Sequence, residues 1–129
     1  MVASQSDDAT ARAAIVAIER FNDAFSRQDI DATMAAMTDD CIFENTYPPP
    51  DGIRCVGQDE VRREFAAFFA SSPSAVFEPE EQFAAGDRCI VRWTYHWQGA
   101  DGVSSHVRGV DVFKVRDGKV AEKLSYVKG

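Results

Sequence analysis

Hydrophobic residues recur at helical spacing in three segments of the N-terminal half of the chain. Residues 9–27 place apolar side chains at positions i, i+4, i+7 and i+11, which predicts an amphipathic helix. Asp29 is suited to cap a second, short helix, and Gly57 precedes a third helix predicted over residues 58–71. The apolar residues of the three segments are Ala14, Ile18, Phe21 and Phe25, then Ile30, Met34 and Met37, and finally Val61, Phe65, Phe68 and Phe69.

Apolar and polar residues alternate in the remaining segments, which is the pattern of β-strands. The first of these is residues 41–47, and the prolines at 48–50 end it because proline cannot continue a hydrogen-bonded ladder. The later strand segments are residues 53–56, 75–84, 88–98, 103–116 and 119–127. This order predicts an α+β fold in which three helices pack on one face of a curved, mainly antiparallel sheet, with a pocket between them.

The segment 103–116 has one carboxylate in an otherwise apolar row. At a period of two, Val107, Gly109, Asp111, Phe113 and Val115 share one strand face, and Asp111 is the only charged member. An ionised carboxylate left unpaired in such surroundings costs about several kcal/mol, so Asp111 either pairs with a cation or stays protonated. Both cases make Asp111 a candidate catalytic acid/base, and the alternative is a structural ion pair or a position at the rim of the sheet.

The cation partner of Asp111 depends on how segments 88–98 and 103–116 pair. If Gln98 lies opposite Val103, Arg92 is diagonal to Asp111 and within reach of it. We expect this register, although a slip of one residue would bring aromatic side chains beside Asp111 instead.

Three aromatic residues of segment 88–98 fall on the other face of the sheet in this expected register. They are Trp93, Tyr95 and Trp97. An apolar patch of that size exceeds what a monomer usually exposes, so it predicts a homodimer interface. The alternative is that the same aromatic residues fill the core.

Asn45 is the polar candidate of the first strand and shares its face with Phe43 and Tyr47. Its amide offers both a donor and an acceptor, which suits it to orient a water or a substrate oxygen. The alternative is a hydrogen bond that holds the proline-rich turn. Tyr47 either lies over the mouth of the pocket or packs on Pro48.

Composition narrows the range of functions. The 129 residues suit a tail of residues 1–8, expected to be flexible, followed by a single domain over residues 9–129. A formal net charge of −7 without clustered Lys or Arg argues against nucleic-acid and membrane partners. Three cysteines without a CxxC pair, no signal sequence and no membrane-spanning run predict a cytoplasmic protein.

Known cofactor and metal motifs are absent from the sequence. The two histidines, His96 and His106, have no metal-ligand spacing around them, and no glycine-rich nucleotide motif is present. We therefore expect no metal and no cofactor. The charged run of residues 62–64 is interpreted as a solvated helix face.

Three blocks of the sequence resemble the SnoaL-like branch of the NTF2-like superfamily. They are RQDIDATMAAMTDDCIFENTYPP, GQDEVRREFAAFF and RGVDVFKVRDGKVAEKLSYV. The resemblance implies a cone-shaped α+β barrel with a deep apolar pocket, usually assembled as a homodimer. The superfamily includes ketosteroid isomerases, polyketide cyclases, limonene-type epoxide hydrolases, dehydratases and non-catalytic binding domains, so the fold does not settle the function.

The resemblance also assigns roles to single residues. By this resemblance, Asp111 matches the protonated acid of the isomerase oxyanion hole, a carboxylic acid that stays neutral at pH 7. The isomerase base and tyrosine correspond here to Asn45 and Phe21. Asn45 and Arg92 match the Asn and Arg of the epoxide hydrolases.

The remaining hydrolase positions differ in this chain. The two acids of the hydrolase site correspond to Thr94 and Ser125, and its water-holding tyrosine corresponds to Phe43. Neither acid is therefore retained.

Together these residues predict a cofactor-free enzyme acting on a small, apolar carbonyl compound or epoxide. Asp111 would be the acid/base group, with Arg92 and Asn45 as its catalytic partners. The predicted pocket residues are Phe21, Phe43, Tyr47, Phe65, Phe69, Thr94, Phe113 and Ser125. The alternatives are a non-catalytic binding or accessory domain with the same pocket, and a structural dimer in which Arg92 and Asp111 form a core ion pair.

Overall fold

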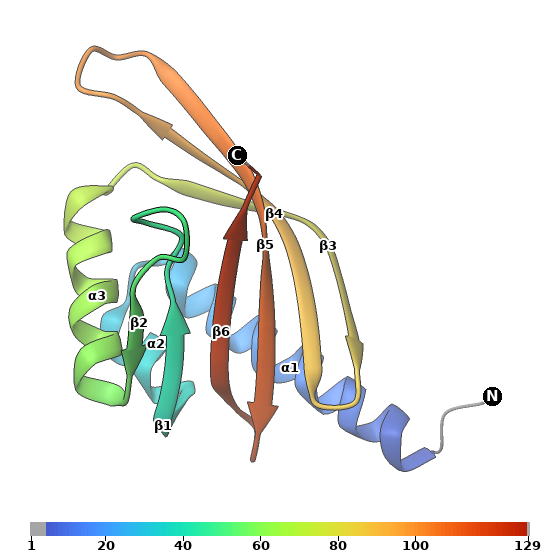
Figure 1. Cartoon of the computed structure of the whole chain (residues 1–129). Coiled ribbons are helices and arrows are strands. Elements are labelled where there is room, and N and C mark those ends of the chain that lie inside the picture. Colours follow the sequence, from blue (N-terminus) through green and yellow to red (C-terminus); the bar gives the residue numbers. More distant parts are fainter. Residues whose placement is uncertain (1–4, 129) are drawn as a thin grey trace.

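The computed structural model describes residues 5–128 and confirms the predicted order of elements (Figure 1). The elements are α1 (Gln5–Ser26), α2 (Ile30–Ala35), β1 (Met37–Glu44), β2 (Arg54–Val56), α3 (Gln58–Ser71), β3 (Val76–Ala85), β4 (Arg88–Gln98), β5 (Ser104–Arg116) and β6 (Lys119–Val127). Helix α1 begins at Gln5, so residues 5–8, which we expected in the tail, are helical; residues 1–4 lie outside the described part of the chain. None of the described helices is long and apolar enough to cross a membrane.

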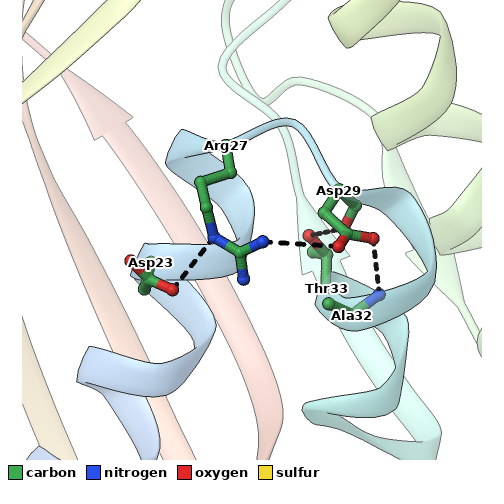
Figure 2. A network of polar contacts seen from close by, with 5 residues as sticks. All are labelled: Asp23, Arg27, Asp29, Ala32 and Thr33. Atoms are coloured by element: carbon green, nitrogen blue, oxygen red, sulfur yellow. Dashed lines mark hydrogen bonds and ion pairs between the residues drawn. The ribbon is translucent and has the colours of Figure 1, made fainter.

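A short turn joins α1 to α2, and Asp29 caps the second helix as predicted. Its Oδ1 accepts a hydrogen bond of 3.1 Å from the backbone N–H of Ala32, and its carbonyl accepts one of 2.6 Å from the hydroxyl of Thr33. Arg27 links this cap to the end of α1 through Asp23 and Asp29 (Figure 2). Capping of this kind typically contributes about 1 kcal/mol, which helps so short a helix to form.

The six strands form one curved, open sheet in the order β2-β1-β6-β5-β4-β3. Only β1 and β6 are parallel, and the other neighbours are antiparallel. The three helices pack on one face of this sheet, with α1 across β3 to β6 and α3 against β1 and β2 (Figure 1). The chain therefore has the predicted cone-shaped α+β fold.

Phenylalanines join the helices to the sheet. Phe21 of α1 lies 5.8 Å from Phe113 of β5 and 6.1 Å from Phe65 of α3 between ring centroids, and all three side chains are almost fully buried. Burying a side chain of this size contributes about 1.5–3 kcal/mol. These rings fix the distance between the helices and the sheet below the site.

The register between β4 and β5 differs by one residue from the one we expected. Gln98 lies opposite Ser104, not Val103, and Val91 lies opposite Asp111. The turn closes on Gly99 and Val103, whose backbones bond at 3.0 Å, and Gly102 takes a left-handed conformation with φ +80°. A three-residue loop ending in such a glycine is a common hairpin connection. The slip turns the aromatic side chains of β4 to the helix-covered face.

Candidate functional site

A cavity of about 160 Å³ lies between the helices and the inner face of the sheet. Eight aromatic side chains line it: Phe25, Phe43, Phe65, Phe68, Phe77, Trp93, Tyr95 and Trp97. The polar lining comes from Asn45, Thr46, Glu64, Lys123 and Ser125, and Val107 and Val127 complete it. An aromatic enclosure with a few polar groups is typical of small-molecule sites.

Asp111 is buried, with 5% of its surface exposed, and is held by two side chains of β6. The hydroxyl of Ser125 donates a 2.6 Å hydrogen bond to Oδ1 of Asp111. Nζ of Lys123 lies 3.4 Å from Oδ2 of Asp111 and donates a 3.0 Å hydrogen bond to Oγ of Ser125. The three groups form a closed polar network. Lys123 and Ser125 reach the main cavity, and Asp111 lines a smaller one of about 30 Å³ beside it.

A bulge in the β5–β6 hairpin brings this network together. The pairs Arg116–Lys119 and Val115–Val120 are followed by Lys114–Glu122, so Ala121 is one extra residue on β6. Without the bulge, the same turn would pair Asp111 with Leu124. With it, Ser125 lies opposite Asp111 and Lys123 lies opposite Phe113, on the inner face.

Lys123 is the main residue of the candidate site that the sequence analysis missed. Its Nζ lies 4.9 Å from the ring centroid of Phe43 and 5.3 Å from that of Phe25, so the ammonium faces two aromatic rings as well as Asp111. Desolvated cation–π contacts contribute about 2 kcal/mol. Along β6, Lys123 alternates with the apolar residues Leu124 and Tyr126. Alternation alone would therefore place Leu124 and Tyr126 on the inner face of the sheet and Lys123 on the outer face.

Arg92 is not the partner of Asp111, which corrects our expectation. Its side chain is half exposed on the outer face of the sheet, 3.7 Å from Glu80 and 3.6 Å from Glu81. Thr94 lies on the same outer face, and its hydroxyl donates to Glu80. This hydrogen bond is the main reason why the pKa of Glu80 lies below its usual value. The one-residue change of register moves both residues out of the site.

Asn45 lines the cavity, where it holds a carboxylate. Its Nδ2 donates a 2.9 Å hydrogen bond to Oε1 of Glu64, and its Oδ1 accepts a 2.7 Å hydrogen bond from the backbone of Thr46. Glu64 lines the same cavity, so our interpretation of residues 62–64 as a solvated face was wrong for this residue. At a helical period, Glu64 falls at the edge of the apolar stripe beside Phe68, and that position was a signal for it.

Of the other predicted pocket residues, some line the main cavity and the rest lie elsewhere. Phe43, Phe65 and Ser125 line the main cavity. Phe21 and Phe113 are core residues below it, Phe69 lines a neighbouring smaller cavity, and Tyr47 is 72% exposed in the proline-rich loop.

Trp93, Tyr95 and Trp97 of β4 line the cavity. We had expected them on the other face of the sheet, in a dimer interface. Trp93 packs edge to face on Phe77 at 5.3 Å, and Tyr95 stacks on Trp97 at 5.1 Å. The homodimer stays a prediction, and these residues no longer support a sheet-face interface. Nε1 of Trp93 is buried and has no hydrogen-bond partner in the described part of the chain.

None of the three cysteines is among the residues that line the main cavity. Burial raises the pKa of Cys41 and of Cys89 to about 11, so both thiols are protonated at neutral pH. Within residues 5–128, no group of three or more His, Cys, Asp or Glu side chains could hold a metal ion.

Comparison with known proteins places this geometry in a family. Residues 18–123 match the SnoaL-like domain family. The chain belongs to this family. An NTF2-like protein of unknown function from Mesorhizobium loti is 39% identical, with a TM-score of 0.77 over 92% of this chain and 93% of that one. No curated protein matches the SnoaL-like chain described here.

Two more distant solved structures share the fold. A proposed polyketide cyclase from Sinorhizobium meliloti is 24% identical, with a TM-score of 0.68 over 87% of this chain and 93% of that one. An LEH-like epoxide hydrolase from M. tuberculosis is 22% identical, with a TM-score of 0.73 over 92% of this chain and 84% of that one. Identities this low establish the fold alone.

Proposed function

We propose that this SnoaL-like protein is a cofactor-free enzyme that performs acid/base chemistry on a small, mostly apolar molecule. The observation that carries the proposal is the buried Asp111–Ser125–Lys123 network at an aromatic cavity. The predicted cytoplasmic location is part of the proposal and is compatible with three free, buried cysteines.

Asp111 acts in this proposal through Ser125. Ser125 lines the main cavity and Asp111 does not, so the serine hydroxyl relays the proton. When a bound molecule loses a proton to Oγ, the serine proton moves to Oδ1 of Asp111, and the reverse transfer returns a proton to the molecule. Lys123 supplies positive charge beside Oγ of Ser125, at 3.0 Å, and stabilises negative charge that develops on the substrate. A positioned acid/base group of this kind typically contributes about 10²–10⁴-fold to the rate.

A second candidate is a non-catalytic binding domain that uses the same cavity. It is favoured by the position of Asp111, which has both oxygens engaged and does not line the main cavity. This candidate predicts ligand binding without turnover. The names of the similar structures, a proposed polyketide cyclase and an epoxide hydrolase, support the enzyme.

The deciding experiment is a turnover assay with two substrate sets. β,γ-Unsaturated ketones are followed by the absorbance of the conjugated enone, and terpene-like epoxides by the mass of the diol. The variants are Asp111→Asn and Ser125→Ala, and the control is Asp87→Asn, an exposed carboxylate in the β3–β4 turn. Circular dichroism verifies that each variant is folded.

We expect both site variants to lose about 10²–10⁴-fold in kcat and the control to retain full activity. The serine variant keeps the Lys123–Asp111 ion pair, so it tests the proton path even if the asparagine variant unfolds. Full turnover in both site variants would overturn the proposal. Binding by the wild type without turnover would favour the binding domain.

A further inference from the structure

The cavity has opposite charges on its two walls. Glu64 reaches it from helix α3, and Lys123 reaches it from strand β6. Lys123 is neutralised by Asp111, whereas Glu64 has no cationic partner within 4.0 Å in the described part of the chain. The uncompensated charge of the cavity is therefore the carboxylate of Glu64.

The orientation of Glu64 is set by Asn45. Because Oδ1 of Asn45 accepts from the backbone N–H of Thr46, its amide nitrogen must point toward Oε1 of Glu64. Oε2 of Glu64 accepts no hydrogen bond from residues 5–128. One oxygen of this carboxylate is thus held in place, and the other is available to a bound molecule.

The sheet side of the cavity offers donors. Lys123 has three N–H groups, of which one is directed to Ser125 and another faces Asp111. The buried indole N–H of Trp93 has no partner among the described residues. That indole nitrogen is shielded within the chain, so the remaining N–H of Lys123 is the donor that the cavity offers to an acceptor oxygen of a bound molecule.

We propose that the cavity takes an aromatic or otherwise flat molecule with an acceptor oxygen at one end and a donatable hydrogen at the other, and that Glu64 is the catalytic residue that accepts this hydrogen. Asn45 is then a positioning residue. The inference rests on the proposed function in one respect: it assumes that the same cavity binds the small molecule.

The proton transfer balances without a further reactant. The ligand's acidic O–H or C–H bond breaks, and its proton goes to Oε2 of Glu64. The electron pair stays on the ligand and moves through its conjugated system to the oxygen beside Lys123. Return of the proton from Glu64 to the product restores the carboxylate.

A matched pair of ligands tests this assignment by binding. 4-Hydroxyacetophenone has a carbonyl at one end and a donor at the other, and 4-methylacetophenone has a group of similar size that cannot donate. Trp93 and Trp97 are the two tryptophans of the chain and both line the cavity, so their indole N–H signals in an NMR titration report binding directly. The variants are Glu64→Gln, which can still accept from Asn45, and Asp59→Asn, an exposed control on the same helix.

We expect the wild type and the Asp59 variant to bind the hydroxyl compound about tenfold more tightly than the methyl compound. Glu64→Gln should abolish this preference, and Glu64→Asp, which withdraws the carboxylate, should reduce it. Equal affinities in the wild type, a preference that survives in Glu64→Gln, or no shift of either signal would each overturn the inference. Because binding is measured here, failure of the proposed function would instead appear in the turnover of the Asp111 and Ser125 variants.

Discussion

Nζ of Lys123 lies 3.4 Å from Oδ2 of Asp111, and each side chain is only 7% exposed. Two buried charges lose most of their hydration, and their mutual attraction offsets that loss only when the remaining hydrogen bonds are also made. Ser125 makes them, since it accepts from Lys123 and donates to Asp111. The desolvation cost of this buried pair is large, and apolar side chains would fill a core at least as well. Its presence beside the cavity is therefore better explained by a role in the site.

Removing one member of this pair should be much worse than removing both. We expect Lys123→Met or Asp111→Leu alone to lower the free energy of unfolding by about 3–5 kcal/mol, because each leaves an uncompensated buried charge. The double variant replaces the pair with apolar side chains and should recover most of that loss. Urea denaturation of the four proteins measures the effect. Losses below about 1 kcal/mol in both single variants would show that the charges are solvated in solution.

The sequence located Asp111 correctly but not its partner. Alternation along β5 was sufficient to identify a carboxylate on an apolar face, and burial confirms that position. The partner depends on two hairpins, and each differs by one residue from the simplest pairing, through the loop at Gly102 and the bulge at Ala121. A shift of one residue reverses the face of every side chain beyond it. In the observed pairing, Arg92 therefore lies on the outer face, and Lys123 lies on the inner face beside Asp111.

The helices were predicted more accurately than the polar residues of the site. The apolar stripe of α3 identified Phe65 as a buried residue, because helical period alone determines which residues face the sheet. Glu64 adjoins that stripe, and its carboxylate is held by a hydrogen bond from Asn45, the residue that follows β1. The helical period could have placed Glu64 at the edge of the cavity, but its hydrogen bond to a residue 19 positions away has no local signal.

Gly109 should be essential to the shape of the cavity. A Cβ at this position would lie 2.5 Å from a ring carbon of Trp93 and would also meet the backbone carbonyl of Tyr126. Gly109→Ala should therefore displace the indole and lower the free energy of unfolding by about 1–3 kcal/mol. Tryptophan emission and urea denaturation measure the two effects. An unchanged spectrum and unchanged stability would contradict the close packing of Trp93 on this glycine.

Thr94 should influence an outer carboxylate and not the cavity. Thr94→Val removes the hydrogen bond that is the main cause of the lowered pKa of Glu80, so that pKa should rise toward its ordinary value. An NMR titration of the Glu80 carboxyl carbon measures the change. The affinity for 4-hydroxyacetophenone should stay the same in this variant and in Arg92→Met. A weaker affinity in both variants would restore these residues to the site.

The buried cysteines should make the fold sensitive to alkaline pH. Burial raises the pKa of Cys41 and Cys89 from 9.0 to about 11, so the unfolded chain loses these protons at lower pH than the folded one. Their contribution to stability is complete below pH 9.0 and is lost as the pH rises to about 11. Urea denaturation between these limits should show a steeper loss of stability in the wild type than in Cys41→Ala/Cys89→Ala. Since the two proteins differ only at these cysteines, parallel pH profiles would show that the two thiols ionise at the same pH in the folded and unfolded chains.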